Sequence, residues 1–212
     1  ATRPSSLSLA LSPYFSLGGI GLDCQGGTKA KLETLRPLNM YGYSKQLFDL
    51  WANRNGILNK IVGLKYFNVF GPRQDPSSPY SGVISIFMTR AALNRAPVIF
   101  GDGHQTRDFV YVRDVVNANL LAAALDQPRG CIFNIGTGNQ VSINRLWELI
   151  AALGGRQNLK PEYEPARAGD IAHSYAAMDF TKTSLKFNPD FSMEQGLEKT
   201  FEWYRGQIVV RR

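Results

Sequence analysis

The stretches Pro37-Leu-Asn-Met-Tyr-Gly-Tyr-Ser-Lys45 and Lys65-Tyr-Phe-Asn-Val-Phe-Gly-Pro72 decide the fold. In the first, Asn39 can cap a helix that we expect over residues 40–53, because apolar side chains recur there with helical spacing. One face of this helix carries Ser44, Leu47, Phe48 and Trp51. Around the second stretch, the apolar run 61–67 predicts a buried strand, followed by a loop rich in Gly, Pro and Asp.

Strand and helix patterns alternate along the rest of the chain. Strands are expected over 98–100, 109–112 and 131–135, and helices over 83–94, from Asp114, after Ser142 and after Ser192. Ser192 and Gln195 have the spacing of a capping box for the last helix. Residues 1–36 show no sustained period and are not assigned. This alternation predicts an α/β fold.

Composition and charge narrow the function. Hydrophobic residues make up 44% of the chain, enough for a packed core, and the formal net charge is +7. The charge favours an anionic partner, but no block of five like charges suggests a nucleic-acid arm, so a phosphorylated small molecule fits better. Two cysteines without a Cys-x-x-Cys pair predict no metal site and a reducing, cytoplasmic compartment. No apolar run is long enough to suggest a membrane span.

Tyr41 and Lys45 are the first candidates for chemistry. At positions i and i+4 of one helix they share a face, which places an ammonium near a phenol. A nearby cation lowers the pKa of a phenol, so the pair suits proton removal from a sugar hydroxyl. The spacing alone also arises by chance in a chain with 9 Tyr, so an ordinary amphipathic helix residue is the alternative.

The ordered set of motifs resembles the extended short-chain dehydrogenase/reductase family of NAD-dependent epimerases and dehydratases, over roughly residues 35–205. Within it, the chain is similar to the 4-epimerases of UDP-glucose or UDP-N-acetylglucosamine. Beyond the two stretches above, the matching segments are 73–83, 100–103, 106–112, 134–138 and 167–170. The resemblance implies a partial Rossmann-like, doubly wound sheet joined to an α/β substrate-binding domain.

The resemblance also assigns roles. Tyr41 matches the catalytic base, Lys45 the cation that lowers its pKa and holds the nicotinamide ribose, and Phe67 a position where the family packs NAD. The implied contacts with the UDP-sugar are Asn68, Arg107 and Arg167 at the diphosphate, Val83, Val98 and Phe100 at the uridine, and Asp170 at a ribose hydroxyl. Ser174, small where the family often has a larger residue, would leave room for an N-acetyl group.

Physical chemistry supports the arginines independently, because guanidinium groups pair bidentately with phosphate oxygens. The alternatives are an ion pair of Arg107 with Asp108 or Asp102, and a solvated turn for Arg167 and Asp170. For Asn68 the alternative is a cap at the strand end, and for Phe67 and Phe100 it is core packing. Gly136-Thr-Gly138 lacks the third glycine of a dinucleotide loop and is interpreted as a structural turn.

The chain departs from the family before Tyr41, because only 40 residues precede it and none form the glycine-rich cofactor loop. We therefore expect a divergent or non-native lead-in over 1–34, a remaining part of the NAD-binding domain over 35–75, and mainly a nucleotide-sugar-binding domain over 76–212. Little or no epimerase activity is expected from this chain alone.

Other functions stay open. The 38–45 stretch also resembles heptose 6-epimerases that act on ADP-sugars, and a non-catalytic nucleotide-sugar-binding module is a second alternative. A nucleic-acid binder rests only on charge and ranks last. Family resemblance suggests a homodimer that uses the Tyr41 helix.

Overall fold

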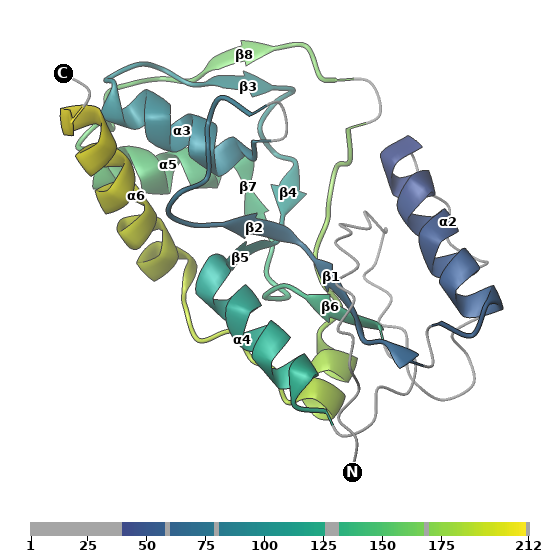
Figure 1. Cartoon of the computed structure of the whole chain (residues 1–212). Helices are drawn as coiled ribbons and strands as arrows, with labels where there is room; N and C mark the ends of the chain where they lie inside the picture. The colour runs from purple at the N-terminus through teal and green to yellow at the C-terminus, as the bar shows by residue number, and fades with distance from the viewer. Residues whose placement is uncertain (1–39, 58–59, 79–80, 126–131, 168–169, 211–212) are drawn as a thin grey trace.

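The computed structural model describes residues 40–57, 60–78, 81–125, 132–167 and 170–210 (Figure 1). Its strands form four pairs. Three are parallel: β1 (Gly63–Tyr66) with β6 (Ile132–Ile135), β2 (Asn68–Phe70) with β5 (Phe109–Tyr111), and β3 (Val98–Phe100) with β8 (Glu162–Glu164). The fourth, β4 (Thr106–Arg107) with β7 (Val141–Ser142), is antiparallel. Parallel pairs with intervening helices confirm the predicted α/β class.

The expected strand over 61–67 changes partner at its end. Up to Tyr66 it pairs with β6, and the Phe67 amide still donates to the Ile135 carbonyl. The next amide, that of Asn68, donates to the Asp108 carbonyl instead, and the chain continues as β2 beside β5. This switch carries Asn68 away from β6 and places it next to the Arg107–Asp108 segment.

Five helical segments follow β2: α3 (Val83–Ala92), α4 (Val112–Ala123), α5 (Ile143–Leu153), the π-helical turn η2 (Thr181–Leu185) and α6 (Met193–Val210). Two predicted caps are confirmed. The Ser142 hydroxyl accepts from the Arg145 amide, and Ser192 and Gln195 exchange both bonds of a capping box. Helix α4 begins two residues earlier than expected, at Val112. The strands β2, β4, β7 and β8 were not predicted. β4 and β7 have only two residues, which carry no readable period, and β8 (Glu-Tyr-Glu) is exposed throughout and has no apolar run.

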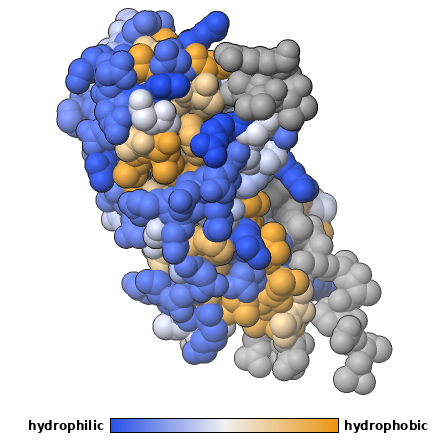
Figure 2. All heavy atoms as spheres, turned by 90° about the vertical axis from the view of Figure 1, so that its left-hand side faces the viewer, coloured by the Kyte–Doolittle hydropathy of each residue, from blue (hydrophilic) through white to orange (hydrophobic). Residues whose placement is uncertain are grey.

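Two apolar clusters hold these elements together. One joins α3, α5 and α6, where the Phe87 and Trp147 rings meet edge to face with centroids 5.6 Å apart. The other joins β1, β6 and α4, where the Phe133 and Phe180 rings stack at 5.2 Å. On the side that carries α6, Figure 2 shows a largely hydrophilic surface broken by separate hydrophobic patches. No helix in the described ranges is long and apolar enough to cross a membrane.

Helix α2 (Met40–Arg54) buries its more polar face and exposes its apolar face, the reverse of an ordinary amphipathic helix. It buries Gly42, Gln46, Asp49 and Ala52, whereas Leu47, Phe48 and Trp51, from the face noted in the sequence, are 46%, 40% and 54% exposed. Met40 and Tyr43 are exposed as well. The apolar spacing therefore predicted the helix correctly, but the buried face is the polar one.

A buried ion pair explains how a polar face can pack inward. The Lys65 ammonium on β1 lies 2.8 Å from the Asp49 carboxylate on α2, and both side chains are almost fully buried. Burial lowers the pKa of Lys65, while Asp49 opposes that shift by favouring the ammonium form. The pair ties the helix that carries Tyr41 and Lys45 to the first strand.

Candidate functional site

A cavity of about 400 Å³ opens between β2, α3, β3 and the segment before η2. Its lining includes all seven residues that the sequence assigned to the UDP-sugar: Asn68, Val83, Val98, Phe100, Arg107, Arg167 and Asp170. They span 103 positions of the chain, from 68 to 170, and come from different elements. Two guanidinium groups and a carboxylate share the cavity with apolar side chains, which is the composition of a site for a charged, partly apolar ligand.

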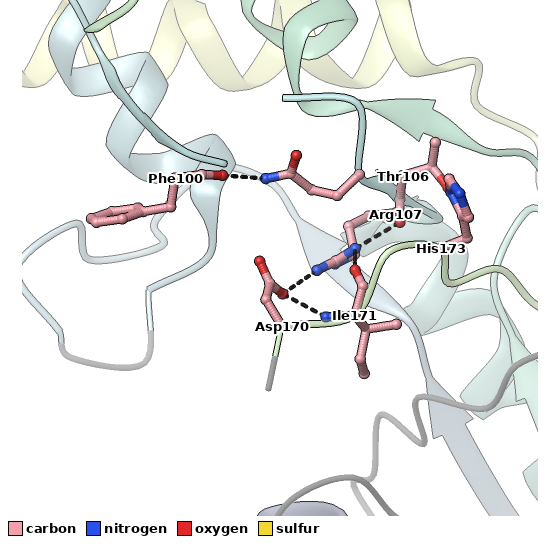
Figure 3. Close-up of polar contacts among 7 residues, drawn as sticks. Phe100, Thr106, Arg107, Asp170, Ile171 and His173 are labelled. Carbon is pink, nitrogen blue, oxygen red and sulfur yellow. Dashed lines mark hydrogen bonds and ion pairs between the residues drawn. The ribbon is translucent and has the colours of Figure 1, made fainter. Parts of the chain in front are cut away.

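Arg107 is the most constrained polar group of the cavity. Its Nη2 lies 2.6 Å from Asp170 Oδ1, and its Nη1 donates to the carbonyls of Thr106 and Ile171 at 2.8 and 2.6 Å (Figure 3). The Arg107 side chain is only 11% exposed. Burial lowers the pKa of this guanidinium, and Asp170 opposes the shift. The alternative pairing of Arg107 with Asp108 or Asp102 is therefore wrong, because Asp170 is its carboxylate partner.

Arg167 lies on an aromatic face. Its guanidinium carbon is 3.8 Å from the centroid of the Phe100 ring, well within the range of a cation–π contact. Phe100 ends β3, and Val98 two residues earlier points to the same side of that strand. An exposed cation stacked on a half-buried ring gives this end of the cavity a flat surface that carries charge.

Asn68 and Asp108 connect the cavity to the sheet. The Asn68 carboxamide donates to the Asp108 carbonyl at 2.9 Å. The fully buried Asp108 carboxylate accepts bonds from Thr137, Gly138 and Ala176. Gly136 must be glycine here, since an added Cβ would lie 2.6 Å from Asp108 Oδ2. Residues 136–138 thus form a structural turn around Asp108, in line with the interpretation that they are not a dinucleotide-binding loop.

Of the predicted cofactor residues, neither Lys45 nor Phe67 lines this cavity. Lys45 is half-buried on α2, and Phe67 is 8% exposed within the apolar cluster of β1 and β6. Tyr41 belongs to α2, but its side chain lies outside the described residues, as does the whole segment 1–39. Ser174 is 1% exposed and does not line this cavity, so its role beside an N-acetyl group stays a prediction.

Six lining residues were missed by the sequence reasoning: Ser81, Ile86, Phe87, Ile99, Gln105 and Ile143. Most are apolar, and no local signal separates a cavity wall from a core position. Gln105 could have been found, because side chains two apart on an extended segment point to the same side, and Arg107 was already assigned to the cavity.

Comparison with known proteins gives consistent results. The family model described as the NAD dependent epimerase/dehydratase family matches residues 21–136. The chain is 38% identical over 170 residues to a UDP-glucose 4-epimerase of Mycolicibacterium smegmatis, covering 80% of this chain and 50% of that protein. It is 36% identical to an ADP-L-glycero-D-manno-heptose-6-epimerase of Nitratidesulfovibrio vulgaris, covering 69% of this chain and 46% of that one.

Solved structures of epimerases are similar to this chain as well. The UDP-glucose 4-epimerase of Thermotoga maritima, crystallised with UDP-glucose, superposes with a TM-score of 0.80 at 34% identity, over 93% of this chain and 63% of that one. A UDP-N-acetylglucosamine 4-epimerase of Methanobrevibacter ruminantium gives a TM-score of 0.76 at 32% identity, over 94% and 63%.

These likenesses confirm the predicted Rossmann-like α/β fold. The chain spans about half the length of the curated relatives that it matches. Since the family model covers more than half of the 212 residues, the chain belongs to the NAD dependent epimerase/dehydratase family.

Proposed function

We propose that the described part of this chain is the nucleotide-sugar-binding portion of an NAD-dependent UDP-sugar 4-epimerase. One observation carries the proposal: seven residues far apart in the sequence, each assigned to the same ligand, line one cavity. Relatives whose names specify UDP-glucose and UDP-N-acetylglucosamine support the substrate class.

The cavity lining can divide the ligand among its groups. Arg107 and Arg167 hold the two phosphates, because planar guanidinium forks pair with phosphate oxygens better than an ammonium does. Phe100, Val98 and Val83 give the base an apolar, partly aromatic surface. Asp170 accepts from a ribose hydroxyl, and Asn68 donates near the diphosphate.

Helix α2 carries the two residues that would perform the reaction. Tyr41 removes the proton of the sugar hydroxyl, and Lys45 favours the phenolate and donates to the nicotinamide ribose. When bound, NAD supplies the hydride acceptor. Among the described residues, Lys45 fits the nicotinamide end, but no glycine-rich loop between a strand and a helix offers a pyrophosphate anchor. Little or no turnover by these 212 residues alone stays the expectation.

Calorimetric titration of the 212-residue chain with UDP tests the binding proposal. We expect saturable binding that weakens about tenfold or more in Arg107→Ala, since a hydrogen bond to a charged group contributes about 1.5–3 kcal/mol. Arg145, an exposed arginine paired with Glu148 outside the cavity, gives the matched control Arg145→Ala. No UDP binding, or equal loss in both variants, would refute the proposal.

The second candidate is an ADP-heptose 6-epimerase, favoured by the relative of that name at 36% identity. Parallel titrations with UDP and ADP separate the two candidates. Tighter binding of UDP supports the 4-epimerase, and tighter binding of ADP supports the heptose enzyme.

The partner proposed for the protein is a second copy of itself, packed through α2. Met40, Tyr43, Leu47 and Trp51 recur at intervals of three and four along the exposed face of that helix. A two-fold axis would place this face against its own copy and cover all four side chains at once. Sedimentation velocity should show a dimer that Trp51→Glu dissociates and Tyr163→Glu leaves intact, since Tyr163 is similarly exposed, at 55% against 54%. A monomeric unmodified chain would refute this arrangement.

The domain division at residue 75 and the cytoplasmic location remain predictions. The β1–β6 pair joins a strand from each side of that division, so limited proteolysis should cut elsewhere if the two sides fold as one unit.

A further inference from the structure

Gln105 lines the cavity together with Phe100 and Arg107, two groups that the proposed function uses. On this extended segment Gln105 and Arg107 face the cavity, whereas Thr106 faces the other way. There the Thr106 hydroxyl contacts Gln140 at 2.7 Å and His173 at 3.0 Å. Gln105 therefore belongs to the cavity wall by register.

The carboxamide of Gln105 is fixed at its far end. Its Nε2 donates to the Phe100 carbonyl at 2.7 Å, a contact marked by a dashed line in Figure 3. Phe100 ends β3, and the next ladder bond runs from the Gly101 amide to the Glu164 carbonyl on β8. On the edge of β3 that no described strand covers, Gln105 thus satisfies the Phe100 carbonyl in place of a neighbouring strand.

The turn that this bond closes has little stiffness of its own. Gly101 and Gly103 both have positive φ, 79° and 75°, a conformation that glycine adopts without strain but also leaves easily. The Phe100 ring projects from the start of this turn and supports the Arg167 guanidinium. A side chain that ties residue 105 back to residue 100 therefore restricts the ring on which the base end of the ligand would lie.

We propose that Gln105 is a positioning residue for the nucleoside half of the ligand, acting through Phe100. This inference rests on the proposed function, because it assumes that a nucleoside diphosphate occupies the cavity. It predicts an uneven effect on the two halves of that ligand. Arg107 is held independently by Asp170 and by the Thr106 and Ile171 carbonyls, so the diphosphate end keeps its main contact when Gln105 is changed.

The test compares Gln105→Met with the unmodified chain in titrations with UDP and with inorganic pyrophosphate. Methionine keeps the length of the side chain but cannot donate to Phe100. We expect UDP binding to weaken about tenfold, as for one lost hydrogen bond, and pyrophosphate binding to weaken less, by about threefold at most. Pyrophosphate keeps its contact with Arg107, and only its contact with Arg167 depends on the Phe100 ring. Gln140→Met is the matched control, since Gln140 lies outside the cavity, and it should alter neither affinity.

A double-mutant cycle tests whether Gln105 acts through Phe100. In a Phe100→Leu background the Gln105→Met change should have less than about a twofold further effect on UDP binding, because coupled residues are not additive. Unchanged UDP affinity in Gln105→Met, equal losses for UDP and pyrophosphate, or full additivity with Phe100→Leu would each overturn the inference. If Gln105→Met fails to fold, Gln105→Ala replaces it with the same criteria. If the unmodified chain binds pyrophosphate but not UDP, the proposed function fails together with the inference. If the unmodified chain binds UDP and the Gln105 variants bind it with the same affinity, the inference fails and the proposed function stands.

Discussion

The Arg107 guanidinium and the Asp170 carboxylate pair with each other at 2.6 Å across 63 positions of sequence. The sequence assigned Arg107 to the diphosphate and Asp170 to a ribose hydroxyl of a bound nucleotide. In the structure the two side chains form an ion pair with each other. The pair keeps a largely buried cation neutralised, since an uncompensated buried charge is costly. It also holds Nη2 of Arg107 in place, while the Thr106 and Ile171 carbonyls hold Nη1.

Replacing Arg107 with lysine should separate charge from geometry. Arg107→Lys keeps a cation beside Asp170 but loses the planar fork that donates to three acceptors at once. We expect UDP affinity to fall about tenfold, by calorimetry at constant salt, with the chain still folded. Arg145→Lys on the surface is the control. An Arg107→Lys variant that binds as tightly as the unmodified chain would mean that only charge matters.

The buried Asp108 carboxylate should be a major determinant of stability. It accepts bonds from Thr137, Gly138 and Ala176, so Asp108→Ala leaves several donors, the buried Ala176 amide among them, without their acceptor. The free energy of unfolding in urea should drop by about 3 kcal/mol or more. Asp179→Ala, at an exposed aspartate, should stay within about 0.5 kcal/mol. Similar values for the two variants would contradict this account.

The Lys65–Asp49 pair should show the asymmetry of buried ion pairs. Lys65→Met leaves the Asp49 carboxylate buried without this ammonium and should cost about 3–5 kcal/mol in unfolding free energy. The double variant Lys65→Met with Asp49→Leu should recover most of that loss, since no charge then stays buried. Chemical denaturation of the four members of this cycle measures the coupling, and strict additivity would exclude it.

Tyr204 should make the protein sensitive to alkaline pH. Its hydroxyl donates to the Gln74 carbonyl, and burial raises its pKa from 10.0 to about 12. Because the folded-state pKa is the higher one, this contribution to stability is fully present below pH 10 and is lost as the pH rises towards 12. Tyr204→Phe should therefore be about 1 kcal/mol less stable at pH 7 but lose less stability between pH 10 and 12.

Thermal unfolding at pH 7, 10 and 11 measures both effects. Tyr163→Phe, at an exposed tyrosine, is the control. Parallel pH curves for the unmodified chain and Tyr204→Phe would contradict the assignment.

Local elements with their own signals could be predicted from the sequence. The helix of Tyr41 and Lys45, the cap at Ser142 and the Ser192/Gln195 capping box depend on neighbours within one or two turns, so the chain encodes them without reference to the fold. The α/β class followed from their alternation with strands. The resemblance to the family's motifs was enough to predict seven of the residues that line the cavity.

The tertiary structure decided which of these groups meet and which faces are buried. Spacing marked Leu47 and Trp51 on one face of α2, but only packing put Asp49 inside, because its partner Lys65 comes from β1. Likewise Asp170, rather than the neighbouring Asp108, pairs with Arg107 because β4 brings the segment 170–174 alongside it. Periodicity reports one element at a time, whereas an ion pair or a cavity depends on contacts between elements that are distant in sequence.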